Sequence, residues 1–137
     1  MSEMTVVHRE HDAFAVLVRG HVIRVDQPYS AGGTDDGPTP VELFVASLAA
    51  CAAHYARRYL VRRGLPADGL EVTAGFAMSA TAPTRVSRIG LRLRPPVPLS
   101  SADAEELRRA VEGCTVHNSV VDAPRIGLEI ETEAEAA

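Results

Sequence analysis

Residues 39–64 read TPVELFVASLAACAAHYARRYLVRRG and predict one long helix. Thr39 and Glu42 have the spacing of a capping box, and Pro40 stands at the first helical position, where a missing N–H does no harm. At the other end a group of arginines favours the negative helix terminus, and Gly64 is a natural left-handed terminator. Both ends of the helix are therefore marked in the sequence.

A cysteine lies at the middle of this helix. The part from Leu43 to Ala53 has no charged residue, so we expect it to be buried on every side and the thiol of Cys51 to be desolvated. Burial favours the neutral thiol over the reactive thiolate, and the helix dipole acts mainly within the first turn, about three turns away from Cys51. A reactive Cys51 therefore needs a cation from elsewhere. Arginine is suited to this role because it stays charged.

Alternating apolar residues predict strands on both sides of the helix. Before it, the sequence predicts a three-strand antiparallel meander, at residues 5–9, 14–19 and 21–26. After it come a hairpin at 71–78 and 88–94, a helix capped by Ser100 or Ser101 that ends at Gly113, and a short helix capped by Thr115. A final strand with Ile126, Leu128 and Ile130 precedes an acidic, alanine-rich tail. The stretch QPYSAGGTDDGPTP, residues 27–40, is a loop that either forms a lid near the thiol or merely connects the meander to the helix.

Length and composition place the chain among single-domain globular proteins. At 137 residues and 46% hydrophobic content it suits one α+β domain spanning residues 1–137. The net charge of −4 gives no basic patch, so nucleic acid is not an expected partner. The first residues lack the apolar core of a signal peptide, and the apolar run of the central helix is too short for a bilayer, which predicts a cytoplasmic protein without a membrane partner.

Two cysteines in a reducing compartment indicate redox or metal chemistry rather than a permanent disulfide. Cys51 is either a small core residue or a nucleophile. Cys114 precedes the short helix, where free N–H groups can steady a thiolate, so it is a plausible attacker of an oxidised Cys51. His54 and His117 each follow a cysteine by three residues, which leaves a Cys₂His₂ zinc site as another hypothesis.

The run GPTPVELFVASLAAC, the later CTVHNSV and the predicted element order together resemble the OsmC family, which includes the organic hydroperoxide resistance proteins. The resemblance implies a β(3)-α-β(2)-α(2)-β fold with a long buried central helix, in an intertwined homodimer whose sites lie at the subunit interface. It also implies a thiol-dependent peroxidase of oxidative-stress defence that needs no cofactor or metal. Cys51 would be its peroxidatic residue and Cys114 its resolving residue, with a hydroperoxide as substrate and a thiol as reductant.

One position departs from the hydroperoxide-resistance pattern. Those relatives carry a glutamate ten residues before the first cysteine, where it holds the catalytic arginine, and this chain has Val41 there. Glu42 lies roughly 100° further around the helix and fits the capping box instead. The run around GHVIRVDQP resembles a less characterised branch of the family. The candidate cations are Arg9, Arg19 and Arg24, and we expect the arginine to be either less fixed or held by some other acid such as Asp35 or Asp36.

The sequence thus predicts a peroxidase that reduces organic hydroperoxides, with hydrogen peroxide as a further candidate substrate. The alternative of another class is a non-catalytic protein that binds a small ligand, or senses redox state, through the interface cavity.

Overall fold

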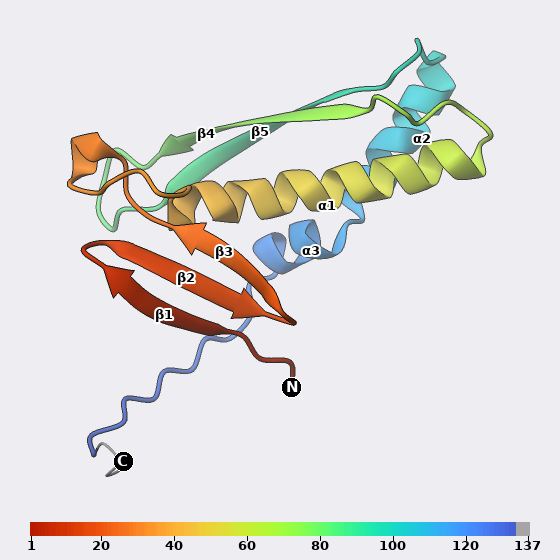
Figure 1. The fold of residues 1–137 in the computed structure, drawn as a ribbon. Coiled ribbons are helices and arrows are strands. Elements are labelled where there is room, and N and C mark those ends of the chain that lie inside the picture. The colour runs from red at the N-terminus through yellow and green to blue at the C-terminus, as the bar shows by residue number, and fades with distance from the viewer. Residues whose placement is uncertain (134–137) are drawn as a thin grey trace.

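The structure is a computed structural model and describes residues 1–133; the last residues of the acidic tail, 134–137, lie outside the described part. The chain begins with strands β1 (Thr5–Glu10), β2 (Ala13–Val18) and β3 (His21–Val25), followed by the 3-10 turn η1 (Tyr29–Ala31) and the long helix α1 (Pro40–Arg62). It continues with strands β4 (Glu71–Met78) and β5 (Val86–Arg94) and helices α2 (Ser101–Glu112) and α3 (Thr115–Val121). The predicted α+β class is confirmed (Figure 1).

Both marked ends of α1 are found where the sequence predicts them. The Thr39 hydroxyl accepts a hydrogen bond from the Glu42 amide at 3.1 Å, and the Glu42 carboxylate accepts one from the Thr39 amide at 2.9 Å. Pro40 is the first helical residue. Gly64 lies just past the end with a φ of 68°, the left-handed conformation expected of a terminator. Both ends of α1 therefore have the structure that the sequence predicts.

Two antiparallel sheets flank α1. Sheet A is the predicted meander, in the order β1–β2–β3, and Arg19 and Gly20 close its second hairpin with positive φ angles. Sheet B is the predicted hairpin β4–β5, in which Val72 pairs with Leu93. Figure 1 places the two sheets on different sides of α1.

Helix α1 has a closed side, which its own chain covers. Sheet B and α2 pack on this side, where the side chains of Ala56, Tyr59 and Leu60 form a core with Leu107 of α2. A polar group reinforces the contact, because the Tyr59 hydroxyl donates to Glu106 at 2.8 Å. The closed side comprises the buried residues Val45, Leu48, Ala52, Ala56, Tyr59 and Leu60.

The opposite side of α1 is open, so the expectation of burial on every side is wrong for the single chain. The open side comprises Ala46, Ser47, Ala50, His54, Arg57 and Val61, all of them exposed. The reason is that no strand of sheet A makes extensive contact with α1 within the described chain. Apolar side chains of sheet A, such as Val6 and Val22, remain exposed as well. No described helix is long and apolar enough to cross a membrane.

The predicted final strand is absent from residues 123–133, which pair with no strand of the chain. Ile126, Leu128 and Ile130 are 92%, 86% and 74% exposed. The alternating pattern marks a segment able to form a strand, but a strand also needs a neighbouring edge to supply its hydrogen bonds. Within the described chain no such edge pairs with this segment.

Candidate functional site

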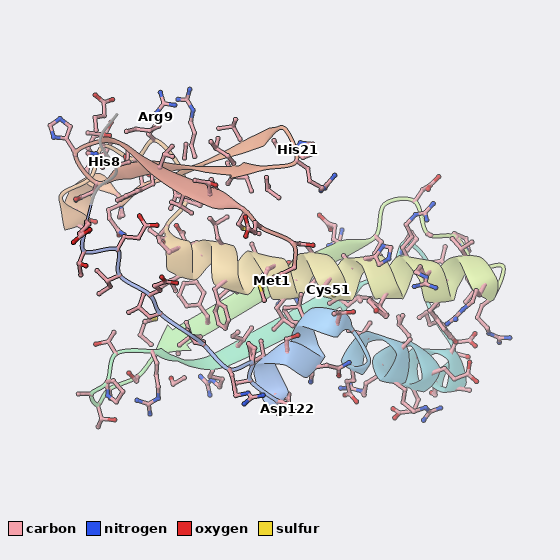
Figure 2. All side chains as sticks on the ribbon, turned by 90° about the horizontal axis from the view of Figure 1, so that it is seen from below. Met1, His8, Arg9, His21, Cys51 and Asp122 are labelled. Atoms are coloured by element: carbon pink, nitrogen blue, oxygen red, sulfur yellow. The ribbon has the colours of Figure 1, made fainter. Side chains whose placement is uncertain are left out.

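The two cysteines, which are far apart in the sequence, meet between α1 and α3. Both are free thiols, and Cys51 lies near enough to Cys114 to contribute to the raised pKa of its thiol. Cys51 is half-buried on the flank of α1 that faces α3, whereas Cys114 is only 1% exposed (Figure 2). The desolvation expected for Cys51 is thus only partial. These residues form the thiol pair, in which Cys51 is half-buried and Cys114 is buried.

Cys114 is itself the N-cap of α3, which corrects the prediction of Thr115 by one residue. Its sulfur accepts a hydrogen bond from the His117 amide at 3.3 Å. Burial raises the pKa of the Cys114 thiol, and contact with Cys51 raises it further, while the amides of His117 and Val116 act in the opposite direction. The net shift of the pKa is upward. The amides therefore do not offset the loss of hydration.

A hydroxyl pair that the sequence reasoning missed lies beside the thiols. Tyr55 is one turn after Cys51 on the same flank of α1, and its hydroxyl is 3.0 Å from that of Thr115, the residue after Cys114. The guanidinium of Arg58 lies over the Tyr55 ring at 5.9 Å, and the His54 ring meets it edge-on at 5.7 Å. Helical spacing from Cys51 could have singled out Tyr55, but nothing local indicates its partner.

An apolar cavity of about 600 Å³ opens next to the thiol pair, between α1, sheet B and α2. Leu48 and Ala52, which flank Cys51 in the helix, line one end together with His117. Neither sulfur lines the cavity itself. Among its other lining residues are Val72, Ile89, Leu91, Leu93, Leu99, Leu107, Arg108, Val111 and Glu112. This volume lies within the range of about 300–1,000 Å³ that is usual for small-molecule sites.

The three candidate arginines lie in sheet A and its second turn. Among the described residues no arginine makes a hydrogen bond to either thiol, and Arg9 points away from α1 (Figure 2). Arg24 differs from Arg9 and Arg19 in having an acid partner, because its guanidinium contacts Asp36 at 3.2 Å. Asp36 is one of the two acids expected to act in place of a carboxylate at Val41.

The loop before α1 is held by a buried carboxylate. Asp26, 1% exposed, accepts hydrogen bonds from the amides of Gln27, Thr34 and Asp36 and from the Thr34 hydroxyl. Burial alone would raise the pKa of Asp26, but these hydrogen bonds outweigh it and lower the pKa. A Cβ atom on Gly33 would lie 2.0 Å from the Gln27 carbonyl oxygen, so this close packing requires glycine. The loop is therefore a fixed connection in this structure.

The residues of the hypothetical zinc site do not assemble. Within residues 1–133 no group of three or more histidine, cysteine, aspartate or glutamate side chains is placed to share a metal ion. His54 lies exposed on α1, whereas His117 faces the cavity.

The sequence model of the OsmC-like protein family matches residues 33–129, a range that includes both cysteines. The chain belongs to the OsmC-like family. No curated protein matches the sequence at a significant level. The recognition made from the two cysteine motifs is thus confirmed.

Solved structures support the OsmC-like fold at low sequence identity. A protein from Psychrobacter arcticus has a TM-score of 0.80 at 19% identity, covering 87% of this chain and 88% of its own. An OsmC-like protein from Mycoplasma pneumoniae has a TM-score of 0.76 at 18% identity, with coverage of 90% and 89%. The organic hydroperoxide resistance protein OhrB of Bacillus subtilis has a TM-score of 0.62 at 19% identity, with coverage of 86% and 90%.

Proposed function

We propose that this OsmC-like chain is a thiol-dependent peroxidase in which Cys51 attacks a hydroperoxide and Cys114 resolves the product. The observation that carries the proposal is the contact between the two thiols. Their unequal burial supports the assignment of roles, because the half-buried sulfur can meet an incoming substrate and the buried one cannot. Membership of a family with hydroperoxide resistance proteins among its structural neighbours agrees with this chemistry.

The reaction balances with the two thiols and one hydroperoxide. The Cys51 thiolate attacks the outer oxygen of the peroxide, the O–O bond breaks, and the alcohol leaves after taking a proton, so that Cys51 becomes a sulfenic acid. The Cys114 sulfur then attacks the Cys51 sulfur, an S–S bond forms, and the sulfenic oxygen leaves as water. A thiol reductant restores both cysteines by exchange with the disulfide.

The cavity supports an organic hydroperoxide as the substrate class. Its lining is mostly aliphatic, and it ends beside the residues that flank Cys51. Burying the apolar group of a substrate there gains about 25 cal/mol per Å² removed from water. Hydrogen peroxide offers no such group, so it should react as a smaller and poorer substrate.

A second copy of the chain is part of the proposal. The open side of α1 carries small residues, Ala46, Ser47 and Ala50, over which the backbone of another helix could approach closely. Exposed apolar side chains of sheet A and residues 126–130 add to an uncovered surface that is unusual for a monomer. A homodimer would cover these surfaces and bring the arginines of one copy toward the thiols of the other.

Arg24 is the best-supported cation for Cys51 in such a dimer. An activating arginine needs an acid that fixes its direction, and Arg24 has Asp36 in this role. Asp36 in turn belongs to the loop that Asp26 holds. This arrangement supplies what a glutamate at position 41 would supply. Because both side chains of the ion pair are half-exposed, they can move toward a partner subunit.

Single-turnover consumption of cumene hydroperoxide by the fully reduced protein tests the proposal. We expect the wild type to consume one equivalent and to lose the mass of two hydrogen atoms as the disulfide forms. Cys51→Ser should consume none. Cys114→Ser should consume one equivalent and stop at a sulfenic acid that dimedone traps. Consumption by Cys51→Ser at the wild-type rate would contradict the assignment.

The cavity also gives the non-catalytic alternative, binding of a small ligand, a site at which it can be tested. If neither cumene hydroperoxide nor hydrogen peroxide changes the mass at Cys51, the protein is better described as a small-ligand binder. Binding of a fluorescent apolar probe, lost in the cavity variant Leu91→Arg, would then identify the cavity as the site.

Sedimentation at low micromolar concentration tests the dimer. The wild type should sediment as a dimer and Ala50→Arg as a monomer, because an arginine on the open side would be buried without a partner. The matched control is Ala80→Arg, at an exposed alanine outside α1 and the strands. A folded wild-type monomer would contradict the shared interface.

A further inference from the structure

Helix α3 carries the buried thiol and has few ties to the rest of the chain. Its main contact is with α1. Among the hydrogen bonds of the described residues, the Tyr55–Thr115 pair is the one side-chain bond that joins α3 to another element. The other side-chain bonds of α3, made by Asn118 and Ser119, stay within residues 113–119. The position of Cys114 therefore depends on the Tyr55–Thr115 hydrogen bond (the tie) and on apolar packing.

The tie is well placed to control the distance between the sulfurs. Tyr55 lies one turn from Cys51 on the same flank of α1, and Thr115 is bonded to Cys114 in the chain, so the tie and the thiol pair are adjacent bridges between the same two helices. The Tyr55 ring also contacts Arg58 and His54 of the same helix. The hydroxyl of a side chain on α1 thus holds the first residue of α3.

We propose that Tyr55 is a positioning residue that holds Cys114 within reach of an oxidised Cys51 and so sets the rate of disulfide formation. This inference rests on the proposed peroxidase function. Its chemistry is the resolving step, in which the Cys114 sulfur forms the S–S bond, the S–O bond of the sulfenic acid breaks, and the oxygen leaves as water with the proton of the thiol. Tyr55 contacts Thr115 and takes no part in bond making.

The resolving step competes with a second oxidation. A sulfenic acid that waits for Cys114 can react with another hydroperoxide molecule, which transfers an oxygen to the sulfur as its O–O bond breaks and leaves a sulfinic acid. Loosening α3 should therefore change the partition between disulfide and sulfinic acid. The first attack on peroxide does not involve Cys114 and should be insensitive to the tie.

The test separates these two steps by rapid mixing with cumene hydroperoxide, followed by acid quenching and mass analysis. Tyr55→Phe keeps the ring and removes the hydroxyl, and Thr115→Val removes the other hydroxyl while keeping the side-chain size. In each we expect disulfide formation to slow by about three- to tenfold, the equivalent of one modest hydrogen bond, with the rate of sulfenic acid formation unchanged. Tyr55→Phe combined with Thr115→Val should be no slower than either variant alone.

Tyr29→Phe is the matched control, because Tyr29 lies exposed in η1 and should leave both steps at the wild-type rate. Sulfinic acid should appear at a three- to tenfold lower peroxide concentration in the two tie variants. Wild-type disulfide rates in both variants, or equal slowing of both steps, would overturn the positioning role. Failure of the wild type to form sulfenic acid would instead overturn the proposed function. If Tyr55→Phe does not fold, Thr115→Val tests the same bond.

Discussion

The closed and open sides of α1 differ in what covers them. On the closed side, sheet B and α2 cover a buried core, and Tyr59 and Arg63 of the α1 end bond to Asp103 of α2 at its edge. On the open side, sheet A is regularly paired within itself yet barely touches the helix. Strand pairing alone thus orders sheet A, whereas the fixed position of α1 depends on packing. The contrast shows that α1 is a fully formed helix with both ends capped, although only one of its sides is packed in a core.

The largest expected effect compares two neighbouring residues on the two sides. Leu60 is 0% exposed and Val61 is 53% exposed. Leu60→Ala should lower the free energy of unfolding by about 2–5 kcal/mol, because it leaves a cavity in the core. With both changes made in the monomeric Ala50→Arg variant, Val61→Ala should change it by less than about 0.5 kcal/mol, as is usual for surface positions. Equal losses in urea denaturation would mean that the open side is packed in solution.

A somewhat smaller effect concerns the loop that connects sheet A to α1. Gly33→Ala should cost about 1–3 kcal/mol, the range for overpacking, since its methyl group would collide with the Gln27 carbonyl and with Asp26. Gly75→Ala is the control, because a Cβ atom there meets no other atom within 4 Å. Thermal unfolding monitored by circular dichroism would measure both variants. A neutral Gly33→Ala would show that the loop adapts easily and that Asp26 does not fix it.

Two carboxylates, Asp103 and Asp26, should both make the free energy of unfolding depend on pH, and their contributions should differ in how they respond to salt. A hydrogen bond from Arg63 lowers the pKa of Asp103 on the closed side, whereas backbone amides overcome burial to lower the pKa of Asp26. A lowered pKa stabilises the folded chain above the unfolded value of about 3.9, and this contribution disappears as the pH falls through the folded pKa.

We therefore expect the free energy of unfolding to fall below about pH 4 and the fall to be shallower in Asp103→Asn. High salt should weaken the part due to Asp103, which rests on an ion pair, and spare the part due to Asp26. Urea denaturation at several pH values, at low salt and at about 1 M salt, would measure the free energy of unfolding. An unchanged pH slope in Asp103→Asn would contradict this assignment.

The smallest expected effect is at the exposed ion pair between β3 and the loop before α1. Asp36→Asn removes the charge that holds Arg24 and should change the free energy of unfolding by less than about 1 kcal/mol. The same variant should nevertheless slow the alkylation of Cys51 if Arg24 serves the thiol. Asp35→Asn is the matched control. A large loss of stability in Asp36→Asn would make the pair a structural element instead.

Local patterns predicted the elements whose causes are local. The capping box of Thr39 and Glu42, the terminator Gly64 and the Ser100 cap of α2 depend on residues a few positions apart. Three strands and one hairpin followed from alternation alone. The final strand failed because alternation around Leu128 cannot provide a partner edge.

The site was predictable only in part, for the same reason. Cys51 and Cys114 could be named from their motifs, but their contact joins distant segments. The Tyr55–Thr115 bond spans 60 residues, and no residue near either end indicates the other. The buried role of Asp26 is equally hidden, because four donors from the following loop become its partners only after the loop folds back.

The position of Cys114 as a helix cap has a consequence for any substitution made there. One sulfur atom both accepts a hydrogen bond from the His117 amide in the first turn of α3 and supplies the thiol, so Cys114→Ala removes two functions at once. Alanine is a poor N-cap, and losing a good cap typically costs on the order of 1 kcal/mol, enough to fray a helix of seven residues. Serine keeps an acceptor at the same place and is a better cap than cysteine. A comparison of Cys114→Ala with Cys114→Ser therefore separates the effect of losing the nucleophile from the effect of unwinding α3.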